Sequence, residues 1–169
     1  FLYAPRATYR TRSGRSNPRN ALVGENPPAG VILSYYLKSA QKDAITLEIL
    51  DGQSKGVRKF TSRERKEEQA PEEWVDEERS REHIPGEAGM NRWTWNLRYE
   101  EPTRIPAAVY DEGRPLGQLA LPGAYRVKLT VAGKSWTAPF DVKPDPRVTT
   151  SPADLQKQFE LMTRMRDRQ

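Results

Sequence analysis

The strongest constraint on the fold is a hairpin pattern near the C-terminal end of the chain. Apolar and polar residues alternate over residues 125–131, and after a short turn they alternate again over residues 136–142. A period of two places successive side chains on opposite faces of a strand. Pro144 and Pro146 follow directly, and proline cannot donate a hydrogen bond to a sheet. The sequence therefore predicts two paired strands that share one buried face.

Four earlier segments show the same alternation, namely residues 31–37, 45–49, 57–61 and 91–99. A polar loop at residues 51–56 joins the second and third of them as a hairpin. No helical pattern lies between these segments, which excludes a parallel, doubly wound sheet. Many short strands at regular intervals are typical of an antiparallel β-sandwich.

The last part of the chain changes its period and predicts an amphipathic helix within residues 148–169. Ser151 suits the N-cap, Pro152 suits the first helical position, and Asp154 can accept from free amides of the first turn. No stop signal precedes the last residue, so we expect the natural chain to continue. Apolar side chains recur at helical spacing, at Leu155, Phe159, Met162 and Met165.

Polar segments surround this small core, because Leu, Ile, Val and Phe make up only 31 of the 169 residues. Residues 1–22 contain five Arg and no acidic residue, so their charge of +5 equals the net charge of the whole chain. We interpret them as a basic arm. The sandwich is predicted over residues 23–147. Residues 62–88, with nine acidic side chains between Glu64 and His83, predict a mobile acidic insertion, and residues 100–122 are a proline-rich loop.

The residue counts exclude several kinds of site. The chain has no Cys, which excludes disulfides, thiolate metal sites and a cysteine nucleophile. His83 is the single histidine, and its charged neighbours predict a solvated surface position. The Asp and Asn residues show no calcium-loop spacing, so we predict neither a metal nor a cofactor. No apolar run approaches the ~20 residues that span a bilayer. The chain opens on Phe1 with no apolar leader and is expected to be an excerpt of a longer protein.

The tryptophans are the best candidates for a binding surface. Trp93, Trp95 and Trp136 each share a strand face with other apolar residues, and we predict that all three lie in the core. Trp74 stands in the acidic insertion with only Val75 beside it, and is the one candidate ligand or partner contact. The carboxylates gather in that same insertion, where nothing predicts the rigid pocket of an acid–base pair, so no catalytic residue is predicted.

Three stretches resemble the Ig-like module of flagellar hook-capping proteins. The same module is found at the ends of many secreted bacterial proteins. They are residues 45–60 (ITLEILDGQSKGVRKF), residues 88–98 (AGMNRWTWNLR) and residues 121–129 (LPGAYRVKL). The tryptophan of that module is usually followed by Asp-Gly, whereas Asn96 and Leu97 follow Trp95 here. The resemblance implies an Ig-like or fibronectin type III-like antiparallel β-sandwich with a C-terminal α-helix and long polar loops.

A closer resemblance adds residues 24–30 (GENPPAG), residues 35–38 (YYLK) and residues 143–147 (KPDPR). Together the motifs resemble the C-terminal region of exported proteins with sortilin-like, BNR-repeat β-propellers, which are often labelled glycosyl hydrolases. The likeness covers residues 1–6 and 22–169 apart from the acidic insertion. It implies a periplasmic or extracellular location and a propeller that precedes Phe1, and any hydrolysis would belong to that propeller.

The function expected from these observations is that of a non-catalytic accessory module. Its partners would be the propeller and the helical segments of its own parent chain. The alternative from another class is a carbohydrate-binding module, in which Trp74 or an outward tryptophan stacks on glycans. A lesser alternative is nucleic-acid binding through the basic arm, which carries Phe1, Tyr3 and Tyr9 among its arginines but lies in an otherwise neutral chain.

Overall fold

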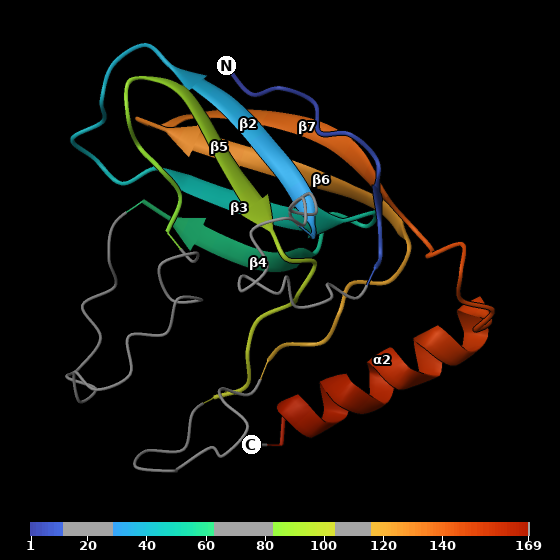
Figure 1. Ribbon diagram of the computed structural model, residues 1–169. Coiled ribbons are helices and arrows are strands. Elements are labelled where there is room, and N and C mark those ends of the chain that lie inside the picture. The colour runs from blue at the N-terminus through green and yellow to red at the C-terminus, as the bar shows by residue number, and fades with distance from the viewer. Residues whose placement is uncertain (12–28, 63–82, 104–115, 169) are drawn as a thin grey trace, which may run out of the picture.

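The computed structural model describes residues 1–11, 29–62, 83–103 and 116–168. Within these residues the chain is mostly β-strand, with one helix toward its C-terminal end (Figure 1). Six of the strands match the predicted alternating segments, although the one at residues 89–95 ends earlier than expected, and a short further strand at residues 8–9 lies in the predicted arm. The elements are β1 (Thr8–Tyr9), β2 (Val31–Leu37), β3 (Thr46–Asp51), β4 (Gly56–Thr61), β5 (Gly89–Trp95), β6 (Gly123–Val131), β7 (Lys134–Lys143) and α2 (Pro152–Arg166).

The strands form two sheets. The larger sheet has the order β1-β7-β6-β3-β4, and all of its pairs are antiparallel except β1 with β7. The smaller sheet pairs β2 with β5 in antiparallel register, with Val31 opposite Trp95. In Figure 1 β2 and β5 lie across the strands of the larger sheet. One apolar core, which includes side chains from both sheets, lies between them.

Aromatic side chains join the two sheets across this core. The ring centroids of Phe60 and Trp93 lie 4.4 Å apart, and those of Trp95 and Phe140 lie 6.2 Å apart. Trp95 is fully buried, and its Nε1 donates to the carbonyl oxygen of Arg98 at 2.9 Å. Such offset and edge-on pairs add to the free energy that burial supplies. The prediction that Trp93 and Trp95 lie in the core is confirmed.

Trp136 differs from this pattern, because 37% of its surface is exposed. It has the inward parity of Ala138, Phe140 and Val142, yet β1 pairs only with the last two residues of β7. At Trp136, therefore, β7 is the edge of the larger sheet. The prediction that Trp136 lies in the core is wrong. The alternation of residues shows on which face of the sheet a side chain lies, but not whether a neighbouring strand covers it.

The first residues of the predicted basic arm belong to the sheets. Leu2 bridges Tyr35 beside β2, and the amide of Tyr3 donates to the carbonyl oxygen of Ser34 at 3.1 Å. The chain then crosses to the larger sheet, where β1 pairs in parallel with β7. Arg10 Nε donates to the carbonyl oxygen of Ala120 at 2.9 Å. Residues 12–22 of the predicted arm lie outside the described residues.

The end of the predicted acidic insertion packs on the sandwich. His83 bridges Thr61 at the end of β4, and Ile84 is buried in the core. The Tyr35 hydroxyl donates to the carbonyl oxygen of Pro85. Asn91 is buried, and its side-chain amide donates to the carbonyl oxygen of Glu87 at 2.8 Å. Residues 63–82, which hold most of the acidic side chains, lie outside the described residues.

The chain leaves β5 through a tight turn. Leu97 has a φ of 61°, a left-handed value that a strand does not tolerate, and this ends β5 before the predicted residue 99. The two ends of the proline-rich segment then pair with each other. The amide of Tyr99 donates to the carbonyl oxygen of Gln118 at 3.0 Å, and that of Ala120 donates to Leu97 at 2.7 Å. Residues 104–115 lie outside the description.

The helix α2 begins as the sequence predicts. Ser151 is the N-cap and its Oγ accepts from the amide of Asp154 at 3.1 Å, with proline in the first turn. Phe159 and Thr163 of the helix contact the sandwich. The rings of Tyr99 and Phe159 meet edge-on at 4.9 Å, and Gln118 Nε2 donates to Thr163 Oγ1 at 3.0 Å. No residue of α2 is buried, so the helix is attached at one side of the sandwich without becoming part of its core.

Candidate functional site

The smaller sheet presents an unusual surface on the side that faces away from the core. Residues 1–3 lie beside β2, so this side spans three adjacent segments. Alternation turns every second side chain outward. We call these residues the outer aromatic face, which consists of Phe1, Tyr3, Ile32, Ser34, Tyr36, Met90, Arg92 and Thr94.

The backbone pairing aligns the large side chains of this face in a row. Phe1 and Tyr36 exchange two backbone hydrogen bonds, of 2.9 and 3.0 Å, and Tyr36 lies opposite Met90 in the register of β2 and β5. Adjacent strands lie about 4.8 Å apart, so the three side chains are immediate neighbours. They are exposed by 65% at Phe1, 45% at Tyr36 and 62% at Met90.

The next row along the strands is more polar. Tyr3 is 42% exposed and lies beside Ser34, which is opposite Arg92 on β5. The ring of Tyr3 meets that of Phe1 edge-on, with centroids 4.8 Å apart and an interplanar angle of 77°. Arg92 is the one charged side chain of the face, which contains no Lys, Asp or Glu.

The outward side of the larger sheet has the opposite character. Glu48 on β3 lies between Lys59 on β4 and Lys128 on β6, with N–O distances of 3.5 and 3.1 Å. The hydrogen bond from Lys128 and the two positive charges lower the pKa of the Glu48 carboxyl. Exposed ion pairs of this kind are typical of a solvated surface and add little stability. Within one molecule, therefore, one outward sheet surface is charged and the other is largely aromatic and apolar.

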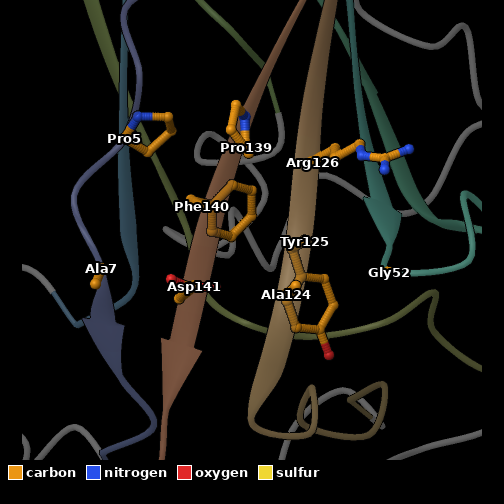
Figure 2. A pocket seen from close by; sticks show the side chains of 9 residues that line it. All are labelled: Pro5, Ala7, Gly52, Ala124, Tyr125, Arg126, Pro139, Phe140 and Asp141. Atoms are coloured by element: carbon orange, nitrogen blue, oxygen red, sulfur yellow. The ribbon is translucent and has the colours of Figure 1, made fainter.

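A shallow hollow lies over β6 and β7 beside residues 5–7 (Figure 2). Its volume is about 340 Å³, and of the nine residues that line it only Arg126 and Asp141 are charged. Arg126 is held by a hydrogen bond of 2.8 Å to Ser54 Oγ. Its lining contains one carboxylate, that of Asp141, and no Ser, Thr, His or Lys.

Among the other titratable groups of the described residues, those with a shifted pKa take part in hydrogen bonds or ion pairs within the fold. Burial raises the pKa of Tyr35 and of Tyr125, whose hydroxyls donate to backbone carbonyl oxygens. Asp145 accepts from Arg147 at 2.7 and 2.9 Å, and these bonds lower its pKa to about 2. Within residues 1–11, 29–62, 83–103 and 116–168, no cluster of three or more His, Asp or Glu is placed to hold a metal ion. No helix in those ranges is long and apolar enough to cross a membrane.

The structure describes some of the tryptophans considered as site residues, but not all of them. Trp74, the candidate ligand contact, lies outside the described residues. Trp93 and Trp95 point into the core and offer no ring to a ligand. The sequence predicts a binding surface at tryptophan residues, and the outer aromatic face, which has none, is not among those predictions. A usable signal was present in residues 31–37, where Ile32 and Tyr36 put large apolar groups on the face opposite the core.

Comparison with known proteins gives no relative, since no family model, no curated protein and no solved structure matches the chain. The resemblance to propeller and hook-capping proteins therefore stays a prediction. A proposal for the function has to be argued from the fold and its surfaces.

Proposed function

We propose that the chain is a non-catalytic interaction module with an Ig-like β-sandwich fold, carried by a larger exported protein. Its work is to bind another protein surface through the outer aromatic face. In this proposal the partner is a neighbouring domain of the same parent protein, such as the propeller that the sequence resemblance implies. The single observation that carries the proposal is the contrast between the aromatic and the charged outward surfaces of the two sheets.

The strand order supports the Ig-like part of this proposal. Immunoglobulin-type sandwiches place the first, second and a later strand in one sheet and the remaining central strands in the other. Here residues 1–3, β2 and β5 form one sheet, while β3, β4, β6 and β7 belong to the other. These folds also carry a tyrosine near the start of the penultimate strand whose hydroxyl bonds a backbone group upstream. Tyr125 stands at that place and donates to the carbonyl oxygen of Leu121 at 2.8 Å.

The composition of the outer aromatic face supports a protein partner. The centres of protein interfaces are enriched in Tyr, Phe, Met and Arg, and depleted of Lys, Glu and Asp. The exposed large side chains of the face, Phe1, Tyr3, Tyr36, Met90 and Arg92, all belong to the enriched types. Taking about 200 Å² for a whole large side chain, the exposed parts of Phe1, Tyr3, Tyr36 and Met90 amount to ~400 Å². Exposed apolar patches of this size are often functional.

Hydroxyl-radical footprinting tests this proposal through side-chain accessibility. The isolated chain is compared with the full-length product of the reading frame that contains it. In the isolated chain Tyr36 should be oxidised much faster than its fully buried neighbour Tyr35. In the full-length protein the rates of Tyr36 and Met90 should fall toward that of Tyr35, while exposed Trp136 serves as the control. Unchanged rates at Tyr36 and Met90 would show that the face stays open and would contradict the proposal.

The second candidate is carbohydrate binding, because three aromatic side chains lie on one sheet face. Sugar stacking requires ring faces that lie flat toward the ligand, and the 77° angle between Phe1 and Tyr3 gives these rings no common plane. Affinity electrophoresis on soluble polysaccharides separates the candidates. Retardation that is lost in Tyr36→Ala, or in Trp74→Ala for the predicted contact, would favour the glycan.

A further inference from the structure

One edge of the larger sheet is open over the first half of β7. On the side opposite β6, β1 pairs only with Val142 and Lys143, and no other described segment pairs with β7 there. Residues 134–137 are all exposed, whereas buried and exposed residues alternate in the rest of the strand. The described part of the chain therefore leaves a stretch of β7 without a neighbouring strand.

The backbone groups that this edge presents can be assigned. The carbonyl oxygen of Lys143 accepts from the amide of Arg10, so the backbone groups of Lys143 face the edge. Backbone groups alternate between the two sides of a strand, so those of Pro139, Thr137 and Ser135 face the edge as well. Pro139 agrees with this, because a proline within a sheet is confined to positions where its missing amide faces no partner strand. The donors and acceptors of the open edge are thus those of Ser135 and Thr137.

The open stretch has a defined length. It begins after the turn between β6 and β7, where the φ of Gly133 is 76°. It ends before Pro139, which has no amide to donate to a further strand. The stretch therefore consists of residues 134–138, and Trp136 is its middle residue.

A second copy of the chain fits this stretch when a two-fold axis passes beside Trp136. An antiparallel neighbour in that register places Ser135 of each copy opposite Thr137 of the other. All edge-facing amides and carbonyls of these two residues then have partners, and Pro139 stays outside the ladder. A register centred on Thr137 would instead place Pro139 opposite Ser135 of the other copy, whose carbonyl would have no donor.

The side chains of the stretch also suit this register. Trp136 lies opposite Trp136 of the other copy, at a pair without backbone hydrogen bonds, where facing side chains approach most closely. The exposed 37% of its surface then lies against a second indole. Lys134 is the one charged residue of the stretch and lies opposite Ala138, so no two like charges face each other.

We propose that two copies of the chain associate through residues 134–138 of β7, paired antiparallel across a two-fold axis at Trp136. The larger sheets of the two copies then form one continuous sheet. The outer aromatic face belongs to the other sheet, so this association goes beyond the proposed binding of a neighbouring domain. A strand pair of this length buries less than the ~1,200 Å² of stable complexes, so we expect the dimer at chain concentrations of about 0.1–1 mM.

Single cysteines test the register, because the chain has no Cys of its own. Trp136→Cys places two thiols opposite each other, at a Cα separation of about 4.5 Å that a disulfide can bridge. Thr137→Cys leaves its two thiols on a diagonal of about 7–8 Å, which a disulfide does not span. Under oxidised glutathione, Trp136→Cys should form covalent dimers at least about tenfold faster than Thr137→Cys. Met90→Cys, exposed on the outer aromatic face, measures the rate of random collisions.

Sedimentation equilibrium measures the association of the unmodified chain. Wild type should pass from monomer to dimer between about 10 µM and about 1 mM, whereas Thr137→Pro should remain monomeric. The new proline removes an amide that faces the edge, as Pro139 already does, so circular dichroism should show an intact fold. Hydroxyl radicals should oxidise Trp136 more slowly in concentrated than in dilute protein, so Trp136 serves as the exposed control only in dilute samples.

Three results would overturn the inference. A wild-type chain that stays monomeric at about 1 mM would exclude a second copy as the occupant and leave the edge to a strand of another protein. Equal cross-linking in the three cysteine variants would indicate random collision, and faster cross-linking in Thr137→Cys would indicate a different register. A dimer that persists in Thr137→Pro and disappears in Tyr36→Ser with Met90→Ser would assign self-association to the outer aromatic face.

Discussion

The hydroxyl of Tyr125 donates to the carbonyl oxygen of Leu121, four residues earlier in the chain, at 2.8 Å. The bond fixes the corner through which the chain enters β6, the strand at the middle of the larger sheet. The ring of Tyr125 stacks on that of Phe140 at an interplanar angle of 20°, so the corner is also tied to β7. The side chain of Tyr125 thus orients the hairpin of β6 and β7, which is the hairpin most clearly predicted by the sequence.

Replacing Tyr125 by Phe should lower the free energy of unfolding by about 1–3 kcal/mol, because the ring keeps its packing while a partly buried carbonyl loses its donor. Urea denaturation measures the change. Tyr36→Phe is the matched control, since Tyr36 is 45% exposed and its loss of a hydroxyl should cost little. Equal stability of the two variants would show that the corner bond contributes nothing.

Gly30 sits where β2 begins beside the end of β5. Its φ is 127°, and an added Cβ would collide with the carbonyl oxygen of Trp95. Gly30→Ala should therefore destabilise the protein by more than about 1 kcal/mol, since strain and collision act together. Gly56→Ala is the control, because a Cβ at Gly56 meets nothing within 4 Å. Comparable urea midpoints for the two variants would contradict the left-handed φ of Gly30 and its close approach to Trp95.

The Asp145–Arg147 pair predicts a pH dependence of stability. The hydrogen bonds from Arg147 lower the pKa of the Asp145 carboxyl from 3.8 to about 2. A carboxyl whose pKa is lowered by folding stabilises the native state above its unfolded pKa, and this contribution is lost as pH falls through the folded pKa. Wild type should be more stable than Asp145→Asn above about pH 4, and the difference should shrink as the pH falls toward 2 and vanish below it.

Denaturation of both proteins at several pH values measures this difference. Asp141→Asn is a suitable control, because Asp141 is exposed and lies outside the turn at residues 145–148. A difference that stays constant through the acid range would show that the pair is not formed in solution.

The attachment of α2 should be separable from the stability of the sandwich. Phe159→Ala removes the ring that meets Tyr99, and amide hydrogen exchange in α2 should accelerate because short isolated helices are marginal in water. Global unfolding should change by less than about 1 kcal/mol, since no residue of α2 is buried. Leu161→Ala, on the opposite side of the helix, should leave exchange in the sandwich and the docking of α2 unchanged. A collapse of global stability in Phe159→Ala would instead make α2 part of the core.

The strands and the helix cap could be predicted from the sequence because they depend on local rules. Alternation identifies residues 125–131 as a strand, and Ser151 with Pro152 identifies the start of α2. The end of β5 could not be predicted, because the polar-apolar alternation continues to residue 99 while the left-handed φ of Leu97 turns the chain.

The candidate site depended on information that no local rule contains. The sequence predicts residues 1–3 as part of a charged arm, and only their pairing with β2 places Phe1 beside Tyr36. The exposure of Trp136 likewise follows from the shortness of β1, which leaves most of β7 as an edge. Long-range pairing of this kind is invisible in the hydrophobic pattern of a single strand.

The parallel pairing of β1 with β7 also determines how the protein would carry a mechanical load. Thr8 lies opposite Val142 and Tyr9 opposite Lys143, and the amide of Arg10 donates to the carbonyl oxygen of Lys143 at 2.8 Å. A force that pulls the chain outward before β1 and after β7 acts on opposite ends of two parallel neighbours. It therefore stretches their hydrogen bonds together in shear, whereas an antiparallel terminal pair would open one bond at a time.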